Sequence, residues 1–341
     1  MQPLVSVIVL TYNQEYWIRT TLDSILSQKT ECSYEIVIGE DFSPDNTRKI
    51  CKEYVDKYEN VLLTEQDSNL GVVGNFANCL KQCKGKYIMV CAGDDYWHNL
   101  NKLQLQVDFM ESNPSCVVCH TDINLLNENS GKIIQEYNKR KNIFPPEGKI
   151  QNEVIAGKEC IRAVTMCIRK ETLLRYCDFE KWIELGFPRE DWPMLFIVSA
   201  YGDINYLPIS TATYRVGQES ISNTLSYDKI RLRYQKDKVM TAYLYSLFPN
   251  LGEFKDEWWY ETYVYQSLLV AAYHNNDYQS AKEFAKKSPK NSMKKKCAKN
   301  WISFKIFRLY DKIFQELIEL KIVLFSPTHY AGWIVRQGYY I

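Results

Sequence analysis

Strand-like and helix-like patterns alternate along the first part of the chain. Near-continuous β-branched runs predict buried strands at residues 4–10, 34–39, 61–64 and 87–91. Apolar residues at helical spacing, such as Ile18, Leu22 and Ile25, predict helices over 15–28, 47–58 and 74–83. Asp45 or Asn46 can cap the second of these helices. The alternation and the short connections indicate an α/β fold with a parallel, doubly wound sheet.

The rest of the chain changes from a mixed to a helical pattern. We expect a helix over 97–110, a strand over 116–120, a polar region over 122–148 able to hold a hairpin and a loop, a strand over 163–168 and a helix over 192–201. From residue 225 the pattern predicts helices over 227–248, 257–273, 278–287 and 302–324. Two domains are therefore predicted, residues 1–224 and residues 225–341.

Polar side chains follow three of the predicted strands. They are Thr11, Tyr12 and Asn13 after the first, Glu40 and Asp41 after the second, and Asp94 and Asp95 after the fourth. Because the carboxyl ends of parallel strands meet at one edge of a sheet, we expect these side chains around one crevice, with a nucleotide as ligand. The chain has neither a G-x-G-x-x-G nor a G-x-x-x-x-G-K-[ST] motif, so other groups have to hold the phosphates.

Two of these features allow two interpretations each. Gly93, Asp94 and Asp95 are either an ordinary turn or a site where a divalent cation relieves the repulsion between two carboxylates and brings in phosphate oxygens. Tyr12 is either a core aromatic residue or a platform on which a base stacks. The choice depends on the flanking chain.

Several motifs, in order along the chain, resemble those of family-2 glycosyltransferases with the GT-A fold. They are residues 4–13, 35–47, 69–71, 84–88 leading into 93–97, 187–195, 204–208 and 214–216, so that the resemblance covers about residues 4–222. The resemblance implies a GT-A nucleotide-diphospho-sugar transferase-like, doubly wound mixed sheet. It also implies an inverting hexosyl- or N-acetylhexosaminyltransferase that uses a UDP-sugar, a hydroxyl acceptor on a growing glycan or glycolipid, and Mg²⁺ or Mn²⁺.

The resemblance also implies roles for individual residues. Asp95 would bind the metal, and Asp191 would be the catalytic base. The nucleotide and the diphosphate would be contacted by Thr11, Tyr12, Asn13, Asp41, Asn69 and Asp94. From the residues alone, Glu190 and Asp191 would be assigned as the N-terminal cap of the following helix. In the same way, Thr165 and Met166 either border the acceptor pocket or belong to a buried strand.

Some positions depart from the family's pattern. Ala92 stands where an acid is common, residues 75–78 read Asn-Phe-Ala-Asn where Arg-Asn is frequent, and Gly217-Gln218 stands where many members have His. A non-catalytic GT-A-like module that binds a nucleotide sugar or glycan is therefore the alternative function. A nucleotidyltransferase is a weaker third possibility, because its Gly-rich basic loop is missing.

Composition limits the location and the partners. The 341 residues are 46% hydrophobic and 24% charged, as in soluble globular proteins, and neither a signal sequence nor an apolar run long enough to span a bilayer is visible. Eleven scattered cysteines suit reduced thiols, and Cys116 and Cys119 are expected to be buried structural residues. We expect a cytoplasmic protein with no nucleic-acid partner.

Charge is concentrated near the C-terminus. Residues 282–312 hold eleven Lys and Arg against two acids, a net charge of +9 in a chain of net charge +1. With the aromatic and aliphatic residues of 301–310, this segment resembles a surface amphipathic helix that contacts an anionic membrane, at the inner face in a cytoplasmic protein. A solvated charged face is the other interpretation.

Overall fold

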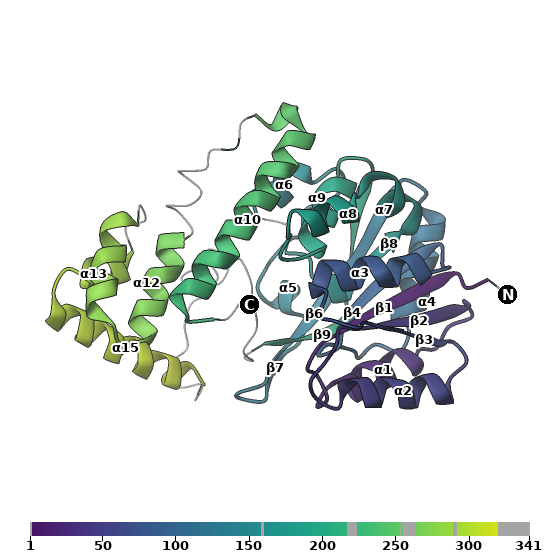
Figure 1. Ribbon diagram of the computed structural model, residues 1–341, viewed down its shortest axis with the longest axis horizontal. Coiled ribbons are helices and arrows are strands. Elements are labelled where there is room, and N and C mark those ends of the chain that lie inside the picture. The colour runs from purple at the N-terminus through teal and green to yellow at the C-terminus, as the bar shows by residue number, and fades with distance from the viewer. Residues whose placement is uncertain are drawn as a thin grey trace. The chain divides into compact units, whose positions relative to one another are not determined.

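One mixed sheet organises the N-terminal half of the protein in this computed structural model (Figure 1), which describes residues 2–157, 160–216, 224–252, 254, 264–288 and 292–319. The strand order is β3-β2-β1-β4-β8-β6-β9-β5, and β7 pairs with β6. Contacts divide the chain into an N-terminal unit, Met1–Gly217, and a helical unit, Gln218–Ile341, which we describe separately. The predicted domain boundary at residue 224 stays a prediction.

The first four strands are parallel and end at the same edge of the sheet. They are β1 (Val5–Thr11), β2 (Tyr34–Glu40), β3 (Val61–Glu65) and β4 (Tyr87–Ala92). Thr11 pairs with Glu40, and Leu10 pairs with Ala92, so the segments that follow β1, β2 and β4 leave the sheet side by side. The predicted doubly wound arrangement of these four strands is confirmed.

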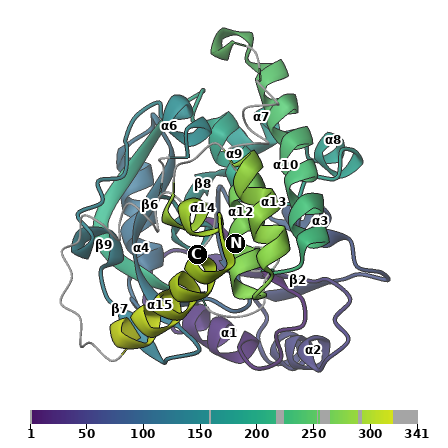
Figure 2. The same cartoon turned by 90° about the vertical axis from the view of Figure 1, so that its left-hand side faces the viewer.

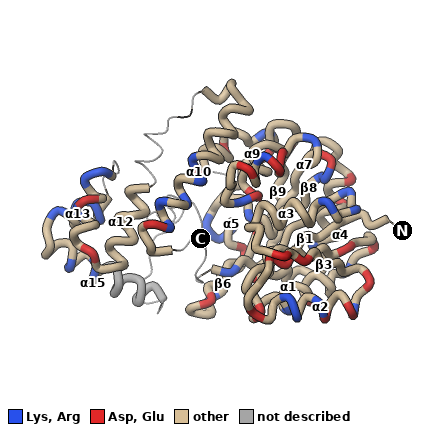
Figure 3. The backbone as a smooth tube through the Cα atoms, viewed as in Figure 1, with Lys and Arg blue, Asp and Glu red and all other residues tan. Residues whose placement is uncertain are grey.

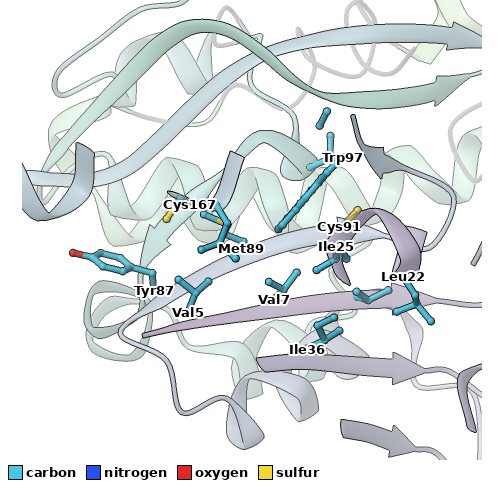
Figure 4. Close-up of a cluster of buried hydrophobic side chains, with 14 of the residues drawn as sticks. Val5, Val7, Leu22, Ile25, Ile36, Tyr87, Met89, Cys91, Trp97 and Cys167 are labelled. Carbon is cyan, nitrogen blue, oxygen red and sulfur yellow. The ribbon is translucent and has the colours of Figure 1, made fainter. Parts of the chain in front are cut away.

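Helices α1 (Ile18–Leu26), α2 (Thr47–Lys57) and α3 (Gly71–Gln82) connect these strands. Figure 4 shows side chains of α1, such as Leu22 and Ile25, packed with Val7 and Ile36 of the sheet. Burial of each such side chain contributes about 1.5–3 kcal/mol. At the start of α2, Asp45 Oδ1 accepts from the Thr47 N–H at 3.0 Å, whereas Asn46 occupies the N-cap position without a side-chain bond to the helix.

The other half of the sheet mixes strand directions. It contains β5 (Tyr96–Trp97), β6 (Cys116–Asn127), β7 (Lys132–Ile134), β8 (Cys167–Arg169) and β9 (Asp203–Val216), with helix α4 (Lys102–Ser112) between β5 and β6. β8 runs antiparallel to β4, β6 runs parallel to β9, and β5 runs antiparallel to β9. The hairpin predicted within 122–148 is present, because Leu125 of β6 pairs with Ile134 of β7.

Two predicted elements differ from the structure. Trp97 does not begin a helix but lies in β5, where it pairs with Ala212, and the helix begins only at Lys102. The predicted strand 163–168 begins as the 3₁₀ helix η1 (Ala163–Thr165), and β8 starts at Cys167. Both differences arise from pairing with distant strands, which local apolar patterns do not record. Thr165 and Met166 are buried, at 1% and 2% exposure, but neither lies in a strand.

Five short helices lie between β7 and β9 in the described part of the chain. They are α5 (Tyr137–Arg140), α6 (Gln151–Ile155), α7 (Lys170–Tyr176), α8 (Phe179–Glu184) and α9 (Asp191–Val198). The predicted helix 192–201 corresponds to α9. All eleven cysteines are free thiols, and Cys116 and Cys119 are buried in β6.

The helical unit has its own hydrophobic core. It contains α10 (Tyr227–Leu247), the 3₁₀ helix η2 (Pro249–Leu251), α12 (Tyr265–His274), α13 (Tyr278–Lys287), α14 (Met293–Cys297) and α15 (Trp301–Glu319). Ile230, Leu268, Phe284 and Phe304 are buried together. Residues 257–263 and 320–324 of the predicted helices, and the Gly217-Gln218 departure, lie outside the described residues. Within the described residues, no helix has the length and apolarity to cross a bilayer.

Candidate functional site

Hydrogen bonds join the loops that follow β1 and β2. They run from the N–H groups of Asn13, Gln14 and Glu15 to Ser43 Oγ (3.0 Å), Thr47 Oγ1 (2.8 Å) and Asp45 Oδ2 (3.0 Å), respectively. Asn13 has a φ of 57°, a left-handed conformation that asparagine adopts more readily than most residues. The loop that carries Tyr12 and Asn13 is therefore held beside the loop that follows Asp41.

Thr11 and Tyr12 occupy opposite environments at the end of β1. Tyr12 is 49% exposed, so it is not a core aromatic residue, and its ring is accessible to a ligand. Thr11 is buried, and its Oγ1 has no hydrogen-bond partner in the described structure; neither has the buried Gln14 Oε1. Buried polar atoms without partners are uncommon, which points to a ligand that satisfies them.

Asp41 connects three segments of the chain. Its N–H donates to the Thr11 carbonyl at 3.1 Å, its Oδ1 accepts from the Leu70 N–H at 2.7 Å, and its carbonyl accepts from Asn69 Nδ2 at 3.1 Å. Burial raises the pKa of the Asp41 carboxyl. The structure thus brings the predicted nucleotide residues Asp41 and Asn69 into direct contact, and leaves Asp41 Oδ2 as the oxygen not used by Leu70.

The Gly93-Asp94-Asp95 segment forms a tight turn against the end of β1. The Asp95 N–H donates to the Ala92 carbonyl at 3.0 Å. A Cβ at Gly93 would lie 2.4 Å from Gln14 Oε1 and 2.7 Å from Thr11 Oγ1, so only glycine fits there. The turn interpretation and the site interpretation are compatible, because the turn that carries Asp94 and Asp95 sets Gly93 against the two unpartnered oxygens.

The two carboxylates of this turn differ in their surroundings. Asp95 is 3% exposed, and its Oδ1 accepts from the Arg215 N–H of β9 at 2.9 Å. Asp94 is partly exposed. Burial raises the pKa of Asp94, and burial together with the neighbouring Asp94 charge raises the pKa of Asp95 well above its usual range. The ionised form of each acid is therefore less favourable here than in water, and a positive charge beside the pair would stabilise it.

These groups fit a divalent cation with hard oxygen ligands. Asp94 and Asp95 supply the carboxylates, and a cation beside them would relieve the repulsion that raises their pKa values. Within the described residues, no group of three or more His, Cys, Asp and Glu side chains is close enough to hold a metal. The protein would thus provide part of the coordination shell, and phosphate oxygens and water would complete it.

Strand β9 brings Tyr214 and Arg215 to the acidic turn. The Arg215 guanidinium pairs with Glu128 and lies 5.0 Å from the centre of the Tyr96 ring. Burial raises the pKa of Tyr214, and the charges of Asp95, Asp94 and Asp191 raise it further, whereas Arg162, 5.9 Å from its ring centre, opposes them. Tyr214 therefore lies within electrostatic reach of the acidic pair and of Asp191.

Asp191 is the first residue of α9. Its Oδ1 accepts from the Trp192 N–H at 2.7 Å, so one oxygen is used at the start of the helix, as the capping interpretation expects, and the other is not part of that bond. Glu190, at the N-cap position, is buried and makes no side-chain bond to the helix. Burial, with the Asp191 charge, raises the pKa of Glu190.

The motif analysis singled out neither Gln14 nor Arg162. Gln14 follows the Thr11–Asn13 cluster directly, so its position was a usable signal. Arg162 has no local signal, because the distance between its segment and Tyr214 is set by the tertiary structure alone. His98 bonds to Thr213 Oγ1 at 3.0 Å and to the Ser210 carbonyl at 3.1 Å, a structural role.

A groove of about 860 Å³ lies elsewhere, along the edge strand β3 between α2 and α3. Its walls include Lys52, Leu62, Glu65 and Lys81, and none of the predicted site residues lines it. Lys52 and Glu65 form an ion pair at 3.1 Å across it. We therefore locate the candidate site at the carboxyl edge of the sheet and not in this groove.

A solved structure shares the fold. The mannosyltransferase PcManGT from Pyrobaculum calidifontis, solved in complex with GDP-Man and Mn²⁺, aligns with a TM-score of 0.55 at 15% identity, over 99% of this chain and 85% of that chain. At this identity the likeness establishes the fold alone. The protein has a mixed α/β sheet of the GT-A type, and a helical region follows it.

Sequence relatives match the chain in part. An uncharacterized protein of Mycobacterium bovis is 29% identical over 214 residues, which are 62% of this chain and 58% of that protein. The UDP-Glc:alpha-D-GlcNAc-diphosphoundecaprenol beta-1,3-glucosyltransferase WfgD of Escherichia coli is 32% identical over 133 residues, which are 38% of this chain and 51% of that protein. The chain thus spans less than two thirds of the length of these relatives.

The family profile described as glycosyl transferase family 2 matches residues 6–176. This range includes Thr11, Asp41, Asn69, Asp94 and Asp95, and it ends before Asp191. Half of the chain therefore matches the family, on a sheet of the corresponding fold. The protein belongs to glycosyl transferase family 2.

Proposed function

We propose that the protein is an inverting, metal-dependent glycosyltransferase that moves a hexosyl or N-acetylhexosaminyl group from a UDP-sugar to a hydroxyl group of a growing glycan or glycolipid. The observation that carries the proposal is the convergence of the strand-end residues: Asp41 bonds to Thr11 and Asn69, and Asp95, in one turn with Asp94, bonds to Arg215 of β9. The E. coli relative, whose name specifies UDP-Glc and a diphosphoundecaprenol-linked acceptor, supports the choice of donor and acceptor class.

The donor's nucleotide fits the joined loops after β1 and β2. Tyr12, with its exposed ring, and Asn13 are the residues we assign to the base and ribose, together with Thr11 at the end of β1. Asp41 Oδ2 is the acceptor we assign to the uracil N3–H, and Asn69 holds the Asp41 main chain in place. A hydrogen-bond donor at that oxygen would favour the ionised carboxylate, against the effect of burial.

The diphosphate and the cation belong to the acidic turn in this proposal. Asp95 would hold Mg²⁺ or Mn²⁺ through Oδ2, the oxygen not used by the Arg215 N–H, with Asp94 in a supporting role. When bound, the cation would neutralise the charge that develops on the departing diphosphate.

Asp191 is the proposed general base. The acceptor oxygen attacks the anomeric carbon from the face opposite the nucleoside diphosphate, so one C–O bond forms as the other breaks and the configuration inverts. The acceptor proton passes to the Asp191 carboxylate, and the electron pair leaves with the diphosphate. Glu190 is buried beside Asp191, and its raised pKa favours the neutral form, which avoids a second negative charge at the base.

We assign this activity to the predicted catalytic domain, residues 1–224. A cytoplasmic location, at the inner face of the membrane, would bring a nucleotide sugar together with a lipid-linked acceptor. The relative's diphosphoundecaprenol-linked substrate supports an acceptor of this kind.

The test is turnover and binding in matched variants. Asp191→Asn should lower UDP release in the presence of acceptor by at least about 100-fold, the usual loss for a general base, while UDP affinity stays unchanged. Asp95→Asn should instead weaken UDP binding in the presence of Mn²⁺, measured by calorimetry. Asp108→Asn, an exposed acid on α4, is the control and should change neither quantity.

Two outcomes would contradict the proposal. Wild-type turnover in Asp191→Asn would move the base to another residue. If the wild-type protein gains thermal stability with nucleotide sugars but releases no UDP with any acceptor, it is a non-catalytic module that binds nucleotide sugar.

A further inference from the structure

Helix α15 carries an apolar face that is exposed to solvent. Its members are Trp301 (57% exposed), Ile302 (65%), Ile306 (64%), Leu309 (60%) and Tyr310 (58%). With 3.6 residues per turn, these positions fall on one side of the helix. We call this set the outer face of α15. Contiguous exposed apolar side chains of this kind mark interaction surfaces in proteins that are otherwise soluble.

The opposite side of α15 is packed inside the helical unit. Phe304 is fully buried, with its ring centre 4.5 Å from that of Tyr273, and Arg308 Nε donates to the Tyr273 carbonyl at 3.0 Å. Figures 1 and 2 show α15 beside α12, and Figure 2 labels α14, which also contacts α15. The outer face is therefore directed away from the core of its own unit. Turning the helix would expose Phe304 and break the Arg308 hydrogen bond, which would destabilise the unit.

Basic residues flank the outer face. Residues 292–310 hold six Lys and Arg and no acid. The hydrogen bonds of Lys295, Lys305 and Arg308 run to neutral oxygens, namely the Ser288 carbonyl, Asn276 Oδ1 and the Tyr273 carbonyl. Among the side chains that the structure describes, none forms an ion pair with these three cations. Lys296 and Lys299 are exposed. Figure 3 shows the blue segments of this part of the chain.

We propose that the outer face of α15 binds the surface of an anionic lipid bilayer, with its apolar side chains in the interface and its lysines on the lipid headgroups. A bilayer of this kind matches both properties of the surface, since apolar side chains enter the acyl boundary and each nearby basic residue gains from the negative surface potential. The inference does not depend on the proposed activity.

Other occupants match only one of the two properties. A nucleic acid would meet the lysines but leave the apolar side chains in water. A second copy that met this surface through its own outer face would bring the same positive charges to the contact. Residues 320–341 of the chain contain Lys321 and Arg336 and no acid, so they offer no opposite charge either.

Flotation of the full-length protein with vesicles tests the proposal. Vesicles of phosphatidylglycerol and phosphatidylcholine in equal parts should carry the protein at low salt, and pure phosphatidylcholine vesicles should not. The double variant Ile302→Ser/Ile306→Ser should lower the partition coefficient roughly tenfold or more. Lys296→Gln and Lys299→Gln should each lower it about fivefold. Leu232→Ser, 54% exposed on α10 of the same unit, is the matched control and should bind as the wild type does.

The outcomes separate the possible partners. The proposal is overturned if vesicle binding does not depend on lipid charge and salt concentration. It is also overturned if the double Ile variant binds vesicles as the wild type does. A dimer in sedimentation velocity that the double variant abolishes, or protection of the outer face by RNA but not by vesicles, would overturn it as well. UDP binding measured in the same variants should be unchanged, so a failure of the proposed catalytic function would leave this result interpretable.

Discussion

Lys102 is buried in the core of the N-terminal unit, at 0% exposure. Its ammonium group donates to Gln106 Oε1 and to the Thr165 carbonyl, and lies 5.2 Å from the centre of the Trp97 ring. These partners are neutral. Burial therefore lowers the pKa of Lys102 to about 8, in spite of the nearby Cys167, Cys119 and Cys91 thiols, whose effect is to raise it.

This lowered pKa predicts a specific dependence of stability on pH. Between about pH 8 and about pH 10.4, the usual lysine value, the unfolded chain binds the Lys102 proton and the folded protein releases it, so the free energy of unfolding rises with pH. Lys102→Met removes this contribution. In urea titrations, the wild type should gain about 2 kcal/mol relative to Lys102→Met between about pH 7 and about pH 9.5.

The comparison cancels the other groups that titrate in the same range. Lys84→Met, at an exposed lysine, should run parallel to the wild type at both pH values. If the Lys102→Met curve is also parallel to that of the wild type, the amine keeps its charge in the folded protein. Burial of the charged Lys102 side chain then costs less free energy than we infer.

At the residue scale, the strand-end pattern identified side chains that the structure brings together. Asp41 contacts Asn69, and Asp94 and Asp95 share one turn, because carboxyl ends of parallel strands converge wherever the sheet forms. Arg162 could not be identified in this way. Its distance to Tyr214 depends on how η1 and β9 pack, and no local spacing encodes that packing.

At the element scale, the short loop between β2 and α2 is bonded both to the start of α2 and to the loop after β1. Asp45 has a double role, since Oδ1 accepts from the Thr47 N–H at the start of α2 and Oδ2 accepts from the Glu15 N–H. Asn46 stands at the N-cap position but its side chain bonds to Glu15 Oε2 instead of the helix. The sequence offered Asp45 and Asn46 equally as the cap of α2, and the structure gives them different hydrogen-bond partners.

Replacing Asp45 should therefore cost more than replacing Asn46. Asp45→Ala removes two acceptors and should lower the free energy of unfolding by about 1–2 kcal/mol, the usual effect of losing a helix-start acceptor. Asn46→Ala removes one exposed bond and should cost clearly less. Urea unfolding of the two variants at neutral pH measures the difference, and equal losses would show that the N-cap position itself determines the start of α2.

The second half of the sheet shows the limit of element prediction. Patterns predicted a strand over the first part of β6 and included Trp97 in a helix, and they predicted no strand over the residues of β9 or over Tyr96 and Trp97. Those two residues are a strand only because β9 lies beside them, where Tyr96 pairs with Thr213. A strand of two residues has no periodicity of its own, so it could not be found from local sequence.

At the scale of the whole molecule, the chain forms two units, and each holds a hydrophobic cluster of its own among the described residues. The candidate site residues, from Thr11 to Tyr214, lie in the N-terminal unit, and the outer face of α15 lies in the helical unit. The proposed chemistry and the proposed membrane contact thus belong to different parts of the chain.

A truncated protein of residues 1–224 tests the predicted boundary. Because the described hydrophobic cluster around Val7, Leu22 and Cys119 contains no residue of the helical unit, the truncated protein should unfold cooperatively and keep the wild-type affinity for UDP in the presence of Mn²⁺, while vesicle binding is lost. Circular dichroism and calorimetry measure the first two properties. An aggregated or non-cooperative product, with the full-length chain folded under the same conditions, would place essential core contacts beyond residue 224.

The sequence by itself determined the parallel half of the sheet, the helical C-terminal part and the convergence of Thr11, Asp41, Asp94 and Asp95. Local periodicity records which side chains are buried, and strand direction then determines where the polar ends meet. Only the tertiary structure decided the β5–β9 pairing, the approach of Tyr214 to the acidic turn and the burial of Phe304 on the inner side of α15. Each of these depends on which distant segment packs against a given side chain, and contacts over long sequence separations leave no trace in local spacing.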